Sequence, residues 1–198
     1  MLRRSSGPRV CAGPKLSACR ERENAMMNQR VVEAINRQIN SELSASYSYL
    51  GMSAWCERQK LTGAARWLRL QSQEEHMHAL KLFDFLLARD CDVDLMAIQA
   101  PHYPYASLLD VFEHGLAQEQ AVSKQIDALY EIAFHEKAFA AVAELQWFLT
   151  EQVEEEKAAL EIVTKLKMTG DDPASLLDMD RELGMRAGVD VPPPAATA

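Results

Sequence analysis

The stretch Gln73-Glu74-Glu75-His76-Met77-His78 decides how this chain is interpreted. Glu75 and His78 are three residues apart, so on a helix they project from the same side, one turn from each other. Their surroundings are apolar and include Trp67, Leu68, Leu82 and Phe85. Burying an unpaired charge is costly unless something neutralises it, and a divalent cation would do so. The alternative is an ordinary amphipathic helix with both residues on its surface.

The composition is that of a soluble globular protein with one domain. The 198 residues are 48% hydrophobic and 25% charged, and eight Gly and eight Pro are too few for a loop-rich β protein. Because no run of about 18 apolar residues occurs, we expect no membrane contact. Residues 1–25 carry a charge of +4 within a net charge of −8, so the body is acidic. An acidic body favours small cations and disfavours nucleic acid as partners.

The ends of the chain differ from its middle. Residues 1–26 are rich in Arg, Ser, Gly and Pro without apolar periodicity, and we expect a disordered basic extension. No apolar core of a signal peptide follows the first arginines, which leaves a transit segment or a later translation start as alternatives. The domain should span residues 27–184, followed by a flexible Pro/Ala-rich tail over 185–198. The four cysteines form no C-x-x-C pair, so we expect reduced thiols and a cytoplasmic protein.

Apolar periodicity and capping residues predict four long helices and a short fifth one. The expected ranges are 28–58, 62–88, 107–134, 137–168 and 172–184. The first helix carries an apolar stripe of Val31, Ile35, Ile39, Leu43, Tyr47 and Leu50. The expected N-caps are Asn28, Thr62, Ser107 and Asp172, and Gly170 should end the fourth helix. The long stretch 89–106, with two prolines and no period, suits a crossover that makes the third helix parallel to the second. The fold class is therefore an all-α four-helix bundle with one long crossover.

Each long helix offers polar groups near its middle that can act as metal ligands. They are Glu42 on the first helix, Glu75 and His78 on the second, Glu119 on the third, and Gln152 and Glu155 on the fourth, with Glu151 and Glu154 beside them. At 1.5 Å per residue, the levels of Glu42 and Glu75 on antiparallel helices agree within roughly 5 Å. Di-iron bundles use one Glu from each of two helices and a Glu-x-x-His from each of the others. Three helices fit, whereas the fourth has Gln152-x-x-Glu155. Oxygen and nitrogen ligands without thiolate suit Fe(II), with Mn(II) and Zn(II) as competitors.

Several motifs occur in order between about residues 28 and 184. They are Asn40-Ser41-Glu42-Leu43 with Tyr49, Met52-Ser53-Ala54-Trp55-Cys56, the stretch 73–78, Leu145-Gln146-Trp147 and Glu151-Gln152-Val153-Glu154-Glu155-Glu156. Together they resemble bacterial non-haem ferritin. Bacterioferritin, the nearby alternative, would place Met after the second-helix Glu and Glu-x-x-His on the fourth helix. His76 stands at the first of these positions, so we expect no haem.

The resemblance implies a ferritin-like bundle with a short fifth C-terminal helix, and an iron-storage ferritin with ferroxidase activity. Such a protein oxidises Fe(II) with O₂ or H₂O₂ and deposits ferric oxyhydroxide inside a hollow homo-oligomeric cage of 24 subunits. By this resemblance, Glu42, Glu75 and His78 would hold the first iron, with Glu75 bridging, and Glu119 and Glu155 would hold the second, with Gln152 nearby. A third iron would be held by Glu74, Glu151, Glu154 and Glu155. Tyr49 would be a redox-active tyrosine, with Trp147 as its aromatic neighbour. A ferritin-like di-iron oxygenase or peroxidase, and a metal-free helical interaction module, are the rival functions. For Glu154 to Glu156 and Tyr49, the simpler interpretations are a solvated face and core packing.

Overall fold

The computed structural model describes residues 27–170 and 172–188, and within these ranges every regular element is a helix. The elements are α2 (Gln29–Arg58), α3 (Thr62–Ala88), α4 (Leu108–His135), α5 (Phe139–Thr169) and α6 (Pro173–Gly184). The predicted all-α class is confirmed, with boundaries within two residues of those expected. The predictions for the extension 1–26 and for the end of the tail, 189–198, concern residues outside the described ranges. None of the described helices is both long and apolar enough to cross a membrane.

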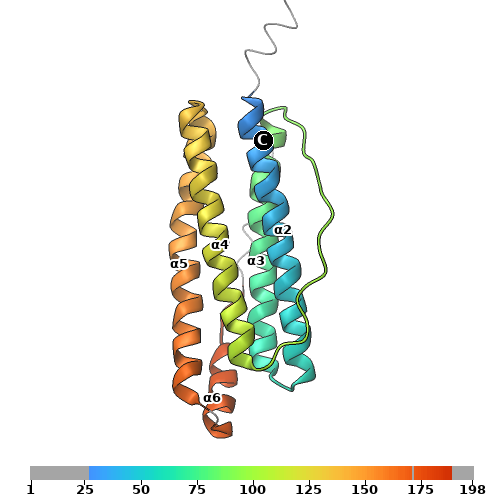
Figure 1. Cartoon of the computed structure of the whole chain (residues 1–198), viewed down its shortest axis with the longest axis vertical. Helices are drawn as coiled ribbons and strands as arrows, with labels where there is room; N and C mark the ends of the chain where they lie inside the picture. Colours follow the sequence, from blue (N-terminus) through green and yellow to red (C-terminus); the bar gives the residue numbers. More distant parts are fainter. Residues whose placement is uncertain (1–26, 171, 189–198) are drawn as a thin grey trace, which may run out of the picture.

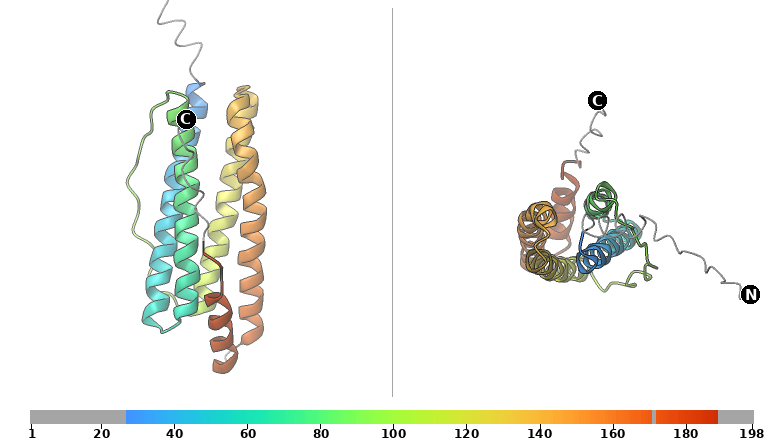
Figure 2. Two further views of the ribbon diagram at one scale, coloured as in Figure 1. Left: turned by 180° about the vertical axis from the view of Figure 1, so that it is seen from behind. Right: turned by 90° about the horizontal axis from the view of Figure 1, so that it is seen from above.

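The four long helices form two antiparallel hairpins, α2 with α3 and α4 with α5 (Figure 1). Between α3 and α4 the chain runs the whole length of the bundle along its outside, as both side views and the view from above show (Figure 2). This crossover makes α3 and α4 parallel, as the long irregular stretch predicts. The hairpins therefore face each other across a shared core.

Two asparagines of α2 hold the crossover. The side chain of Asn36 donates to the Asp92 carbonyl at 3.0 Å and accepts from the Asp94 amide at 2.8 Å. One turn later, Asn40 donates to the Asp94 carbonyl at 2.7 Å and accepts from the Met96 amide at 2.6 Å. Side-chain amides thus satisfy backbone groups that an irregular segment would otherwise leave unpaired.

The helix ends follow the capping predictions in three of four cases. The side chains of Asn28, Ser107 and Asp172 accept backbone N–H groups of the first turns of α2, α4 and α6. Thr62 is not a cap, because it is already the first residue of α3, and the cap position is taken by Leu61, which offers no capping side chain. The missing acceptor comes from another helix, as described next.

Helix α6 completes the beginning of α3. The carboxylate of Asp180 accepts from the Ala64 amide at 2.8 Å, in the position a local cap would take. The backbones approach so closely that a Cβ on Gly63 would lie 1.7 Å from the Asp180 carbonyl oxygen. Glycine at 63 is therefore what allows α6 to pack here, at the foot of the bundle (Figure 1).

The core consists of two apolar clusters with a polar layer between them. One cluster contains Trp67 and Phe112, and the other contains Ile35 and Phe148. Between them, acids and amides from all four long helices are buried. The bundle thus places its polar side chains halfway along helices of about 45 Å.

The apolar stripe predicted for α2 is wrong in its second half. Val31, Ile35 and Ile39 are buried, but Tyr47 and Leu50 are 47% and 46% exposed. Steps of four residues advance about 400° around a helix, so a stripe drawn in such steps drifts by about 40° each time. After four steps it has left the buried face, which instead continues through Glu42 and Tyr49.

Candidate metal centre

Glu42 on α2 is the most deeply buried acid of the polar layer, with no exposed surface. Its Oε1 accepts a hydrogen bond from Gln38 Nε2, one turn earlier, at 2.8 Å. Its Oε2 has no hydrogen-bond partner among the described residues. Burial, followed by the charge of Glu75, raises the pKa of Glu42 to about 8. Near neutral pH this buried carboxyl is therefore largely protonated.

Helix α3 has the same arrangement of a glutamine one turn before a buried glutamate. Glu75 Oε1 accepts from Gln71 Nε2, again one turn earlier, at 3.2 Å. Burial and the charges of Glu119 and Glu155 raise the pKa of Glu75 well above its usual range. The Nδ1 of His78 lies 3.3 Å from Glu75 Oε2, but the pair is not aligned for a hydrogen bond, and neither atom has a partner in the part of the chain that the structure describes.

Three buried side chains thus converge. Glu42, Glu75 and His78 each place one oxygen or nitrogen within 4.8 Å of the others, and within the described residues each also has one buried polar atom without a hydrogen-bond partner. Unsatisfied buried polar atoms are rare and costly in folded proteins. A metal ion among these atoms would satisfy all of them, and the mixed oxygen and nitrogen donors suit iron, manganese or zinc.

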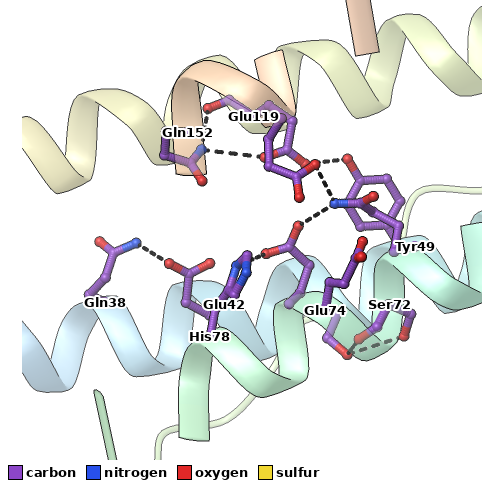
Figure 3. A network of polar contacts seen from close by, with 12 residues as sticks. Gln38, Glu42, Tyr49, Ser72, Glu74, His78, Glu119 and Gln152 are labelled. Atoms are coloured by element: carbon purple, nitrogen blue, oxygen red, sulfur yellow. Dashed lines mark hydrogen bonds and ion pairs between the residues drawn. The ribbon is translucent and has the colours of Figure 1, made fainter. Parts of the chain in front are cut away.

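Glu119 brings α4 into the layer. Its Oε1 accepts from the hydroxyl of Tyr49, and its Oε2 lies 3.4 Å from Gln152 Nε2 of α5. Burial raises the pKa of Glu119, and burial together with the charge of Glu119 raises that of Tyr49. The phenol therefore remains protonated and donates to the carboxylate (Figure 3).

Glu155 of α5 connects the two hairpins. Its Oε2 accepts from Gln71 Nε2 at 2.8 Å, so one amide holds Glu155 and Glu75 together. Burial and the charges of Glu119 and Glu74 raise the pKa of Glu155 to about 7. Ligand atoms of His78, Glu151 and Glu155 form a second cluster within 4.8 Å. The imidazole thus stands beside both groups of acids.

The acids predicted for a third iron lie together on the flank of the layer. A cavity of about 560 Å³ is lined by Glu74, Glu151, Glu154 and Glu155. Lys157, Glu161 and Arg186 also line it, and the guanidinium of Arg186 pairs with Glu74. The sequence predicts the four acids, but not the arginine among them.

Three residues of the site were not predicted from the sequence. Gln38 and Gln71 precede the acids they hold by four residues, and the i, i+4 rule that pairs helical side chains gives the signal for both. Arg186 follows the last predicted helix, where no pattern points back to the core. The ring of Trp147 lies 5.3 Å from that of His78.

The fold and this geometry together define a class. Two helical hairpins enclose carboxylates, one imidazole and supporting amides, which is the construction of bundles that hold metal ions between carboxylate and histidine ligands.

Comparison with known proteins identifies the family within that class. The ferritin-like domain family matches residues 32–169, and the chain belongs to it. The bacterial non-heme ferritin of Staphylococcus aureus is 35% identical over 161 residues, covering 81% of this chain and 97% of the relative. A probable bacterial non-heme ferritin-like protein of Haemophilus influenzae is 38% identical over 159 residues, covering 80% and 96%. The solved open pore ferritin of the archaeon Archaeoglobus fulgidus has a TM-score of 0.81 and 45% identity, covering 82% of this chain and 99% of that one.

Proposed function

We propose that this chain is the subunit of an iron-storage ferritin. It takes up Fe(II), oxidises it at a pair of neighbouring sites and deposits ferric oxyhydroxide inside a hollow cage of 24 subunits in the cytoplasm. The observation that carries the proposal is the group of unpartnered ligand atoms on Glu42, Glu75 and His78. The similarity to bacterial and archaeal ferritins supports iron as the metal and a cage as the assembly.

The two iron sites share Glu75. Glu42 and His78 would complete the first site, and Glu119 and Glu155 the second, with Gln152 at its edge. Two-metal sites hold their ions about 3.5–4 Å apart, a separation that a single carboxylate bridges with its two oxygens. Gln71 holds Glu75 next to Glu155 of the other hairpin, and this arrangement supports the bridging role.

The chemistry follows from the protonation of the acids. In the metal-free site near neutral pH, protons neutralise part of the charge on Glu42 and Glu155, whose pKa values are about 8 and 7. Two Fe(II) ions displace these protons. Each ion then gives one electron to O₂, which with two protons leaves as hydrogen peroxide. Tyr49 donates a hydrogen bond to Glu119, and this contact supports the proposed role of a redox-active tyrosine beside the pair.

A third iron is proposed among Glu74, Glu151, Glu154 and Glu155. The second ligand cluster, in which the buried His78 lies within 4.8 Å of Glu151 and Glu155, supports a cation next to the pair. With Glu161, five acids line this cavity against two cations, Lys157 and Arg186, and this excess of negative charge favours a further cation. Glu155 would serve both the pair and the third ion.

Particle mass and oxygen consumption test the proposal together. Light scattering should give a particle 24 times the chain mass of 22.2 kDa. Titration with Fe(II) should consume O₂ in a rapid phase that saturates near two irons per subunit, followed by slower mineral growth. A small oligomer, or O₂ uptake that needs an organic substrate, would favour a ferritin-like oxygenase or peroxidase. A chain that binds no iron would be a helical interaction module.

A further inference from the structure

The segment after α6 turns back along the bundle and carries one cation into the acidic cavity. Arg66 fixes the backbone of this segment, because its guanidinium donates to the Gly184 carbonyl at 3.0 Å and to the Arg186 carbonyl at 2.5 Å. The Arg186 guanidinium lies over the ring of Trp67, with its carbon 4.4 Å from the ring centroid. Arg186 is therefore held from both its backbone and its side chain.

Arg186 is bound to the metal layer through two acceptors. One terminal nitrogen pairs with the Glu74 carboxylate, and the other donates to Gln71 Oε1 at 2.8 Å. The opposite end of the same amide, Gln71 Nε2, donates to both Glu75 and Glu155. The guanidinium requires the oxygen of Gln71 and the carboxylates require its nitrogen. Arg186 thus fixes the orientation of the amide that holds the bridging acid.

The guanidinium also stands where a metal ion would bind. It lines the same cavity as Glu74, Glu151, Glu154 and Glu155, and it occupies the carboxylate of Glu74. That position is next to the cluster of ligand atoms from the buried His78, Glu151 and Glu155. A cation arriving among these acids meets one that is already tethered there.

We infer that Arg186 acts as an internal competitor for the third metal ion, which binds fully only when the segment 184–188 releases Glu74. The inference rests on the proposed function, since it concerns the regulation of the same site. Two ions load the core acids first, while Arg186 keeps Glu74 neutralised and Gln71 oriented. The third ion then exchanges with the guanidinium. Because the two cations compete, removing the guanidinium should raise the affinity for the third ion about tenfold, within the usual range of coupling between binding sites.

Calorimetric titration of the metal-free, assembled full-length protein with Zn²⁺ tests this without redox chemistry. Arg186→Gln removes the charge and keeps most of the length. Arg181→Gln is the matched control, because Arg181 lies on α6, its side chain is 72% exposed, and among the described residues it pairs with the neighbouring Asp178 alone. Wild type and control should bind two ions tightly and a third weakly. The Arg186→Gln variant should bind the third about tenfold more tightly.

Equal third-step affinities in wild type and Arg186→Gln would overturn the inference. So would Zn²⁺ anomalous density among the four acids of the wild type with the Arg186–Glu74 pair still formed. Absence of the two tight ions from the wild type would count against the proposed function, while the third step would still decide on Arg186. Arg186→Lys gives a second comparison if the Gln variant fails to assemble. It keeps the charge but cannot contact Gln71 and Glu74 as a fork, so its third-step affinity should lie between the other two.

Discussion

Glu42→Gln should have opposite effects on stability in the metal-free and metal-bound protein. The folded chain raises the pKa of Glu42 from 4.5 to about 8, so between these values the folded state binds more protons than the unfolded state. Stability from this group therefore falls as the pH rises from about 4.5 to about 8. At about 1.4 kcal/mol per pKa unit, the penalty is about 1 kcal/mol at pH 5 and roughly 4 kcal/mol at pH 8. Glutamine has nearly the same shape, keeps an oxygen for Gln38 and avoids the penalty.

Thermal unfolding of the metal-free protein measures this difference. For a chain of this size, roughly 4 kcal/mol corresponds to an advantage of the variant on the order of 10 °C at pH 8, shrinking to a few degrees at pH 5. Adding Zn²⁺ should reverse the order, because the neutral amide is a poorer ligand than a carboxylate. Glu33→Gln, an exposed position on the same helix, is the control and should match wild type throughout. A variant less stable than wild type at pH 8, or an equal difference at both pH values, would refute the reasoning.

Further predictions concern the acids, the tyrosine and the extension. Glu75→Ala should slow the rapid phase of Fe(II) oxidation at least about 100-fold, since both ions lose a ligand and even indirect supporting residues cost 10–100-fold; a retained rapid phase in stopped-flow absorbance would remove Glu75 as the bridge. Tyr49→Phe should cost about 1–3 kcal/mol by leaving Glu119 without its donor, and it should change the O₂ consumed per iron. Identical oxygen kinetics would reduce Tyr49 to packing. Glu151→Ala with Glu154→Ala should spare the initial oxidation and lower the iron bound per subunit, as anomalous diffraction from iron-soaked crystals would show. Deleting residues 1–26 should leave particle size and oxidation intact, and light scattering that finds no large particle would show that the extension is structural.

The helices were predictable because their signals are local. Asn28 and Ser107 cap the helices they precede, and Gly170 ends α5 with a positive φ of 54°. The cap of α3 was not predictable, since its acceptor belongs to Asp180, 116 residues away along the chain. Burial on α2 was mispredicted at Tyr47 because the apolar pattern drifts around the helix while the buried face does not.

For the site as well, the features set by local sequence were predictable and those set by contacts between helices were not. The Glu75-x-x-His78 pair and its level relative to Glu42 follow from helical geometry, and the structure brings the three ligand atoms together. Which partners hold these acids depends on contacts between helices, such as the reach of Gln71 across to Glu155. Arg186 depends on a turn after α6 that has no periodic signal.

The polar layer between the two apolar clusters also has a mechanical consequence. Its acids come from both hairpins, with Glu42 and Glu75 on one side and Glu119 and Glu155 on the other. An ion bound by acids of both hairpins would crosslink them in the middle of the bundle, where the core is polar and the acids repel one another. Amide hydrogens near these residues should exchange with solvent faster in the metal-free protein than in the loaded one. In the proposed iron-storage function, the bound iron would in this way make the subunit that stores it more rigid.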